Sequence, residues 1–283
     1  MDATVGAGSE HATRNMPQGG LETSHPPLDR HELADVVDLA LWTGQQLMES
    51  GAESQRVEQS VRAIGQGLGC DWGNVLVSHN ALMVTHVSGA DFRTKLRRIQ
   101  AMNVDMSLIE ALSHIVHRVQ EGKLDRHGLR LQLGSVASTR RHYGRRMTSV
   151  AVGLACAAFC RLFGGDAPAV ITTLGAATAG VLVRYACRDR RLNAFIAAVA
   201  AALSAGVIVG ATHAALGVPA APEPALAASV LLLVPGVPAI NSVEDVIKGH
   251  LVVGLARATT GILTILAAAI GMILAMHLTA VGR

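Results

Sequence analysis

The sequence has few cysteines, no marked excess of either charge and no apolar leader at its start. Its 4 cysteines are too few and too scattered for a disulfide framework. A net charge of +3, spread along 283 residues, makes no basic face of the kind that binds nucleic acid. Residues 1–29 are rich in small and polar residues, so we expect a disordered tail and no secretory signal peptide.

Charge is also scarce along the second half of the chain. Residues 1–146 carry 16 Lys and Arg and 16 Asp and Glu, whereas residues 147–283 carry only 8 and 5. Residues 192–222 contain none of these four residue types. Apolar runs of about 20 residues suffice to cross a bilayer core of roughly 30 Å. The pattern excludes a single soluble domain and predicts a polar domain at 30–146 followed by a membrane domain at 147–283.

The membrane domain is predicted to be helical and to cross the bilayer five times. The expected transmembrane helices are 147–163, 167–183, 192–216, 225–246 and 251–278. Basic residues favour the cytoplasmic side of a membrane, and nine of them then lie inside against two outside. This predicts a cytoplasmic N-terminus and a C-terminus on the opposite side. Runs of small residues predict close helix packing, within the chain or with another membrane subunit.

The polar half is predicted to be an α+β domain on the cytoplasmic side. Apolar residues recur with helical spacing around residues 29–50, 52–68 and 105–119, and a short helix is expected to end near residue 134. Between them, residues 74–78 and 82–87 are typical of a β-hairpin, and 96–100 of a third strand. Helices that flank a small sheet indicate the α+β class.

This half offers incomplete sets of catalytic or metal-binding residues. His114 and His117 are three apart on a helix, but no third metal ligand is identifiable. Asp71, Ser78 and His79 are the residue types of a hydrolase without its glycine-flanked nucleophile turn. Capping and surface charge explain three further carboxylates equally well: Glu49, Glu53 and Glu58. We therefore expect no catalytic residue, no metal and no cofactor, and a membrane-tethered enzyme or sensor is the alternative.

The fourth predicted span is interrupted near its middle by Pro235, Gly236 and Pro238. Proline has no N–H to donate, so both prolines should break the helix, and the break should face protein or a water-filled cavity. We expect a new half-helix to begin at Pro238, with free N–H groups on the next three residues. Such discontinuous helices bind anionic substrate groups in transporters. Pro235, Gly236, Pro238 and Asn241 are therefore the predicted substrate site, against the alternative of an ordinary proline kink.

Three charged residues near this break are predicted to act in coupling or gating. Arg257 lies about two turns into the last span, where it either extends to the membrane surface or pairs with Glu244 or Asp245. Asp245 is one helical turn from Asn241 and would repel an anion, which favours a cation or proton role. No Asp or Glu lies deep within a predicted span, so a carboxylate proton relay through this chain alone is not expected.

Four segments together resemble the threonine/serine exporter family. They are LMESGAESQRVEQSVRAIGQGLG at 47–69, the following VLVSHNALMVT, NVDMSLIEALSHIVHRVQEGKL, and LVPGVPAINSVEDVIKGHLVVGLAR at 233–257. The resemblance covers roughly residues 30–275. It maps the family's proline–glycine motif onto Pro235, Gly236, Pro238 and Asn241, and its Glu-Ser-Gly-Ala motif onto residues 49–52.

The resemblance implies a bacterial inner-membrane exporter with a cytoplasmic N-terminal domain and five transmembrane helices. Full-length family members have ten helices, so it also implies a separate small membrane subunit that supplies the rest. Homo-oligomerisation is a further arrangement left open. The family is linked to export of threonine and serine, and its two-component type to export of succinate. The residues themselves do not separate an amino acid from a dicarboxylate.

Overall fold

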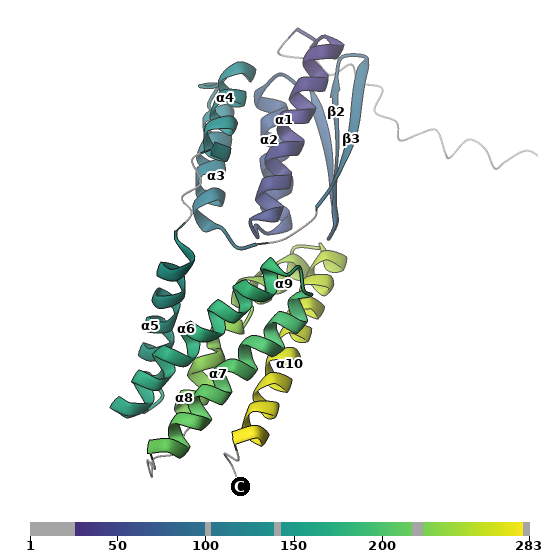
Figure 1. The fold of residues 1–283 in the computed structure, drawn as a ribbon. Helices are drawn as coiled ribbons and strands as arrows, with labels where there is room; N and C mark the ends of the chain where they lie inside the picture. Colours follow the sequence, from purple (N-terminus) through teal and green to yellow (C-terminus); the bar gives the residue numbers. More distant parts are fainter. Residues whose placement is uncertain (1–25, 100–102, 139–142, 217–222, 280–283) are drawn as a thin grey trace, which may run out of the picture.

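The computed structural model describes residues 26–99, 103–138, 143–216 and 223–279. Nearly all of the expected tail lies outside these ranges. The elements form two groups, one stacked on the other (Figure 1). The N-terminal half holds helices α1 (Arg30–Glu49), α2 (Ser54–Gly67), α3 (Met106–Gln120) and α4 (Arg126–Ser138), with a three-stranded sheet. The helical half holds the remaining helices, α5 to α10.

The sheet is antiparallel, with its strands in chain order: β1 (Trp72–Val77), β2 (Ala81–Ser88) and β3 (Asp91–Arg98). The predicted hairpin joins β1 to β2, with Val75 opposite Val84. The third strand begins at Asp91, five residues before the expected Leu96, and the expected end at residue 100 lies outside the described ranges. Its sequence, DFRTKLRR, is mostly polar, so it lacks the alternation of apolar residues that identifies a strand.

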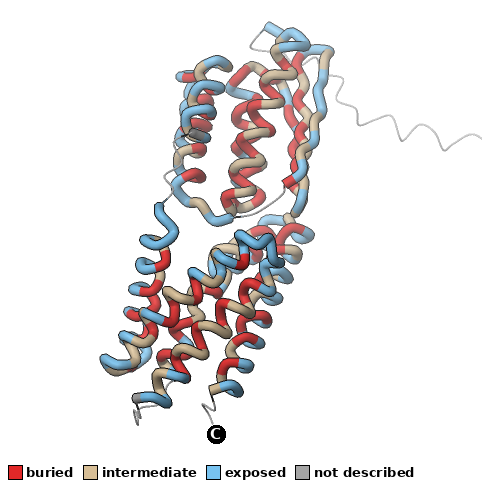
Figure 2. The backbone as a smooth tube through the Cα atoms, in the orientation of Figure 1, coloured by how far each residue is buried: buried red, intermediate tan, exposed pale blue. Residues whose placement is uncertain are grey.

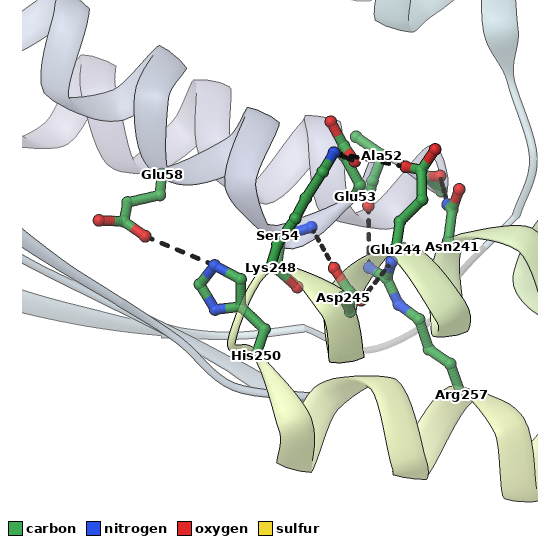
Figure 3. A network of polar contacts seen from close by, with 11 residues as sticks. Ala52, Glu53, Ser54, Glu58, Asn241, Glu244, Asp245, Lys248, His250 and Arg257 are labelled. Carbon is green, nitrogen blue, oxygen red and sulfur yellow. Dashed lines mark hydrogen bonds and ion pairs between the residues drawn. The ribbon is translucent and has the colours of Figure 1, made fainter.

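Helices α1 and α2 cover one face of the sheet, and their apolar residues form the core of the N-terminal half. Helix α1 ends where the sequence predicts, because Gly51 adopts a φ of +84° that ends a helix at little cost. The Ala52 N–H donates to the Leu47 carbonyl across this turn. The turn leaves the carbonyl groups of Gly51 and Ala52 free to accept hydrogen bonds from α9 and α10, and Figure 3 shows Ala52 facing these helices.

The helical half consists of α5 (Arg145–Leu162), α6 (Ala167–Asp189), α7 (Ala194–Leu216), α8 (Glu223–Val230), a short 3₁₀ helix η1 (Leu231–Leu233), α9 (Gly236–Ile247) and α10 (Leu251–Thr279). Among the described residues, α6, α7 and α10 are long and apolar enough to cross a membrane. The pair 223–233 and 236–247 adds a fourth candidate, bent by 60° at its break. Helix α5 falls short because its 18 residues include Arg145, Arg146 and Arg161.

Small residues let the helices of this half approach closely, as predicted. A Cβ added to Gly271 of α10 would lie 2.3 Å from the carbonyl oxygen of Val199 in α7. One added to Gly254 would lie 2.7 Å from the Ser242 carbonyl oxygen in α9. The outward faces of the helices carry exposed apolar residues such as Ile270, which suits a lipid environment (Figure 2).

Candidate functional site

The helix break is present at the predicted residues. Helix η1 ends at Leu233, Val234 is extended, and α9 begins at Gly236 with Pro235 as its N-cap. The start at Gly236 corrects the expected start at Pro238, because Pro238 fits within the first turn, where N–H groups have no helical partner. The Ala239 N–H donates to the Pro235 carbonyl at 2.9 Å, so it is not free as expected.

Helix α9 directs a row of polar side chains toward the turn between α1 and α2 (Figure 3). The Asn241 Nδ2 group donates to the Gly51 carbonyl at 2.6 Å. Asp245 follows Asn241 by four residues, so its side chain lies on the same face of α9. Its Oδ1 accepts the Ser54 N–H at 2.9 Å. These contacts join positions about 190 residues apart in the sequence.

Asp245 thereby caps a helix to which it does not belong. Ser54 is the first residue of α2, and its N–H has no partner within that helix. A carboxylate at this end also interacts favourably with the helix dipole. Asp245 is fully buried, so its charge requires a partner nearby.

Arg257 of α10 supplies that partner. Its Nη1 lies 2.9 Å from Asp245 Oδ2, and its Nη2 donates to the Ala52 carbonyl at 2.8 Å. The contact with Asp245 is not aligned as a hydrogen bond, so it is an electrostatic contact between buried charges. The Arg257 side chain is only 4% exposed. Of the alternatives left open by the sequence, the structure shows pairing with Asp245.

A second set of charges surrounds the buried pair at its more exposed edge. Lys248 contacts Glu53 and lies 3.6 Å from Glu244, and His250 Nε2 lies 3.6 Å from Glu58 Oε2. Burial favours a raised pKa for Glu53, but hydrogen bonding with Glu244 and Lys248 outweighs it and holds the pKa below its usual value. The hydrogen bond to Glu53 raises the pKa of Lys248. Lys248 is therefore charged at neutral pH and ties α9 to α2.

The structure brings together four of the seven predicted site residues: Asn241, Glu244, Asp245 and Arg257. Pro235 instead packs toward α10, where its Cγ lies 3.5 Å from a Cβ built on Gly261. Gly236 and Pro238 belong to the first turn of α9, one turn away from Asn241. We name the contacts of Asn241, Asp245, Arg257 and Lys248 with residues 51–54 the junction network.

Sequence reasoning missed the N-terminal members of the junction network. The carbonyls of Gly51 and Ala52, the N–H of Ser54 and the carboxylate of Glu53 all take part. The available signal was the Glu-Ser-Gly-Ala segment, which stands out in the resemblance without an evident role. Two segments that carry the resemblance, 47–69 and 233–257, meet here.

The other candidate sites in the N-terminal half are not assembled. Asp71 and Ser78 flank opposite ends of β1, which separates them by roughly 20 Å at the usual rise of a strand. The Asp71 carboxylate accepts the Gly89 N–H at 2.6 Å, which fixes the turn after β2. His117 lies 3.3 Å from Glu121 on an exposed part of α3. Within the described ranges, no group of three or more His, Cys, Asp or Glu residues could hold a metal ion.

Comparison with known proteins places the chain in a family. The family model ThrE, described as "Putative threonine/serine exporter", matches residues 38–279. The chain belongs to the threonine/serine exporter family. "Probable succinate transporter subunit YjjP" of Escherichia coli K12 is 32% identical over 241 residues, which is 85% of this chain and 93% of that protein.

A second relative within the exporter family has almost the same extent. The protein of the same name from Klebsiella aerogenes is 32% identical over 248 residues, which is 88% of this chain and 95% of that protein. Both relatives are named as YjjP subunits, which supports the two-component type of exporter family member that the sequence indicates. No solved structure matches the chain significantly.

Proposed function

We propose that this chain is one subunit of an inner-membrane secondary exporter of small carboxylate metabolites, either threonine and serine or a succinate-type dicarboxylate. Its family supports a membrane transporter subunit, and the relatives' names attach succinate to those proteins. The single observation that carries the proposal is a broken helix inside the bundle whose second half is bound to the N-terminal half through the junction network.

The environment of the break favours transport over simple anchoring. Leu233, just before the break, is buried with Ala201 and Ala202 of α7 and Ala268 of α10. Protein thus covers one side of the break, whereas Val234 and Gly236 are exposed, so the open side should face a partner subunit or a water-filled cavity, as a bilayer requires of backbone that leaves a helix. A helix that only tethers a cytoplasmic domain gains nothing from such an interruption, whereas transporters use discontinuous helices to bind substrate and ions.

We assign two roles around the break. Pro235, Gly236, Pro238 and Asn241 line the substrate passage, and in this conformation the Asn241 amide is held by Gly51. Glu244, Asp245 and Arg257 form the coupling or gating element, because moving the N-terminal half relative to α9 and α10 requires Asp245 to release the Ser54 N–H and Arg257 to release the Ala52 carbonyl. Release of the junction network would free Asn241 to contact substrate.

The proposed topology has five spans, a cytoplasmic N-terminus and a periplasmic C-terminus. Helix α5 is then the first span, with its arginines at the membrane surfaces. A small membrane subunit supplies further helices, and the relatives' designation as subunits supports a partner. The exposed apolar faces of α5 and α10 offer places for it to pack.

Metabolite efflux from bacterial cells tests this function. Cells lacking the chain and its partner are complemented with the chain, with the partner, or with both, and external succinate, threonine and serine are measured. Only the pair is expected to restore efflux. Full efflux by the chain alone would contradict the two-subunit proposal, and unchanged efflux in all strains would contradict the exporter proposal.

A further inference from the structure

A cavity of about 500 Å³ lies between α5, α6 and α7, on the side of the helical half where α5 begins. Its wall includes Thr148 of α5 and Arg184, Tyr185 and Arg188 of α6. Leu232 of η1 also lines it, three residues before Pro235. A ligand in this cavity would therefore touch the segment that leads into the break. The volume is within the range of small-molecule sites.

The charges of the cavity are unbalanced. Arg184 and Arg188 are one helical turn apart, which places both side chains on the same face of α6. Neither forms an ion pair with any residue in the ranges that the structure describes. The nearby carboxylate of Asp189 is already held by Arg145, whose Nη1 and Nη2 lie 2.5 and 2.9 Å from its oxygens. Arg145 also lies over the Tyr185 ring, 5.6 Å from its centroid.

The rest of the wall fits a short carbon chain. Val152, Val181 and Ala197 add apolar surface, and no Asp or Glu is among the described residues that line the cavity. Each guanidinium group can bind a carboxylate through two parallel hydrogen bonds. An amino acid would bring an ammonium group to a wall with two unpaired cations and no carboxylate to receive it.

We propose that this cavity binds a small dicarboxylate, with Arg184 and Arg188 each holding one carboxylate group. The inference rests on the proposed export function and selects the dicarboxylate class over threonine and serine as its substrate. The cavity is then the loading site from which the anion reaches the break. The alternative source of the same chemistry is an anionic lipid headgroup, because both arginines lie at the predicted cytoplasmic membrane surface.

Direct binding to the purified full chain in nanodiscs of zwitterionic lipid tests the proposal. Radiolabelled succinate is the probe, and unlabelled succinate, fumarate, threonine and serine are the competitors. Arg184→Gln and Arg188→Gln are measured singly and together. The matched control is Arg190→Gln with Arg191→Gln, which removes the same charge from the same helix end without touching the cavity lining.

The expected result is saturable succinate binding that dicarboxylates compete for and threonine does not. Each single variant should weaken it by roughly tenfold or more, as loss of a hydrogen-bond partner of a charged group does. The control should bind as the wild-type chain does. Arg184→Lys with Arg188→Lys should recover part of the affinity, because the charge returns without the paired donors.

Several outcomes would overturn the proposal: no succinate binding by the wild-type chain, equal loss in the control, or equal competition by threonine. Repeating the assay with phosphatidylglycerol in the nanodisc separates the sources of anion. Abolished succinate binding there would assign the arginines to lipid and overturn the proposal. Cellular efflux distinguishes failure of the cavity proposal from failure of the proposed export function. Efflux unaffected by the double variant refutes the cavity alone, whereas specific binding without any efflux refutes the export function.

Discussion

Replacing Asp245 should release the N-terminal half from the broken helix. In Asp245→Ala, the Arg257 guanidinium stays buried without its opposite charge, and the Ser54 N–H loses its acceptor. Breaking a buried ion pair by removing one partner costs about 3–5 kcal/mol. Asp245→Asn restores an acceptor for Ser54 but leaves Arg257 unpaired, so it should recover only the smaller part of this loss.

The double variant Asp245→Asn with Arg257→Met separates the pair's interaction from other effects. Removing both charges avoids an isolated buried ion, so the double variant should be less destabilised than the sum of the single ones. The expected coupling energy is roughly 0.5–3 kcal/mol. Glu244→Gln is the matched control, because the Glu244 contact with Lys248 is long, its side chain is 43% exposed, and a glutamine amide can keep the hydrogen bond to Glu53. Its effect should stay below about 1 kcal/mol.

Hydrogen exchange at the start of α2 is the most direct assay for this release. If the junction opens 3–5 kcal/mol more easily, exchange of the Ser54 amide in Asp245→Ala should accelerate by roughly a hundredfold or more. The same amide in Glu244→Gln should exchange almost as in the wild-type chain. Unchanged exchange in Asp245→Ala, with normal membrane abundance, would refute the idea that this pair holds the two halves together.

Three further predictions concern packing, pH and topology. Gly271→Val should lower the melting temperature strongly because its Cβ would clash with α7, whereas Gly236→Ala should not, since nothing lies within 4 Å of its Cβ. Equal melting of the two variants would contradict the packing. Burial lowers the pKa of His86 from 6.5 to about 4 in the folded chain, so its contribution to stability should be complete above pH 6.5 and fall as the pH approaches 4. Melting measured across this window should lose part of its pH dependence in His86→Asn, and an unchanged dependence would contradict the assignment. A reporter fused after Gly165 should be periplasmic and one fused after Asp189 cytoplasmic, and the reverse result would invert the topology.

The sequence predicted those features that depend on neighbouring residues. Two prolines around Gly236 are enough to interrupt a helix in any fold, and Gly51 is a strong helix terminator. The first residue of α9 was predicted two residues too late, because the sequence does not show that Gly236 and Pro238 both belong to the first turn of the helix. Strand β3 was mostly missed because its residues are polar and its pairing with β2 comes from the hairpin before it.

Features that depend on residues far apart in the sequence could not be predicted from the pattern of neighbouring residues. From the sequence, Arg257 could either extend to the membrane surface or pair with a carboxylate of the fourth span. Only folding brings Asp245 and the Ala52 carbonyl beside it. Arg184 and Arg188 indicated membrane orientation and nothing more. Only the folded structure shows that both arginines line a cavity. It also shows that Arg145 of α5 holds the Asp189 carboxylate, which would otherwise be their nearest partner in the sequence.

Transport in proteoliposomes tests the central claim most directly. The chain is reconstituted with its small membrane partner around internal radiolabelled succinate, and release is followed for the wild-type chain and for Asn241→Leu. The account predicts saturable release that needs both subunits and that weakens in Asn241→Leu at low succinate, with equal protein incorporated. No succinate release above protein-free liposomes by the pair, or full release by the chain alone, would contradict it.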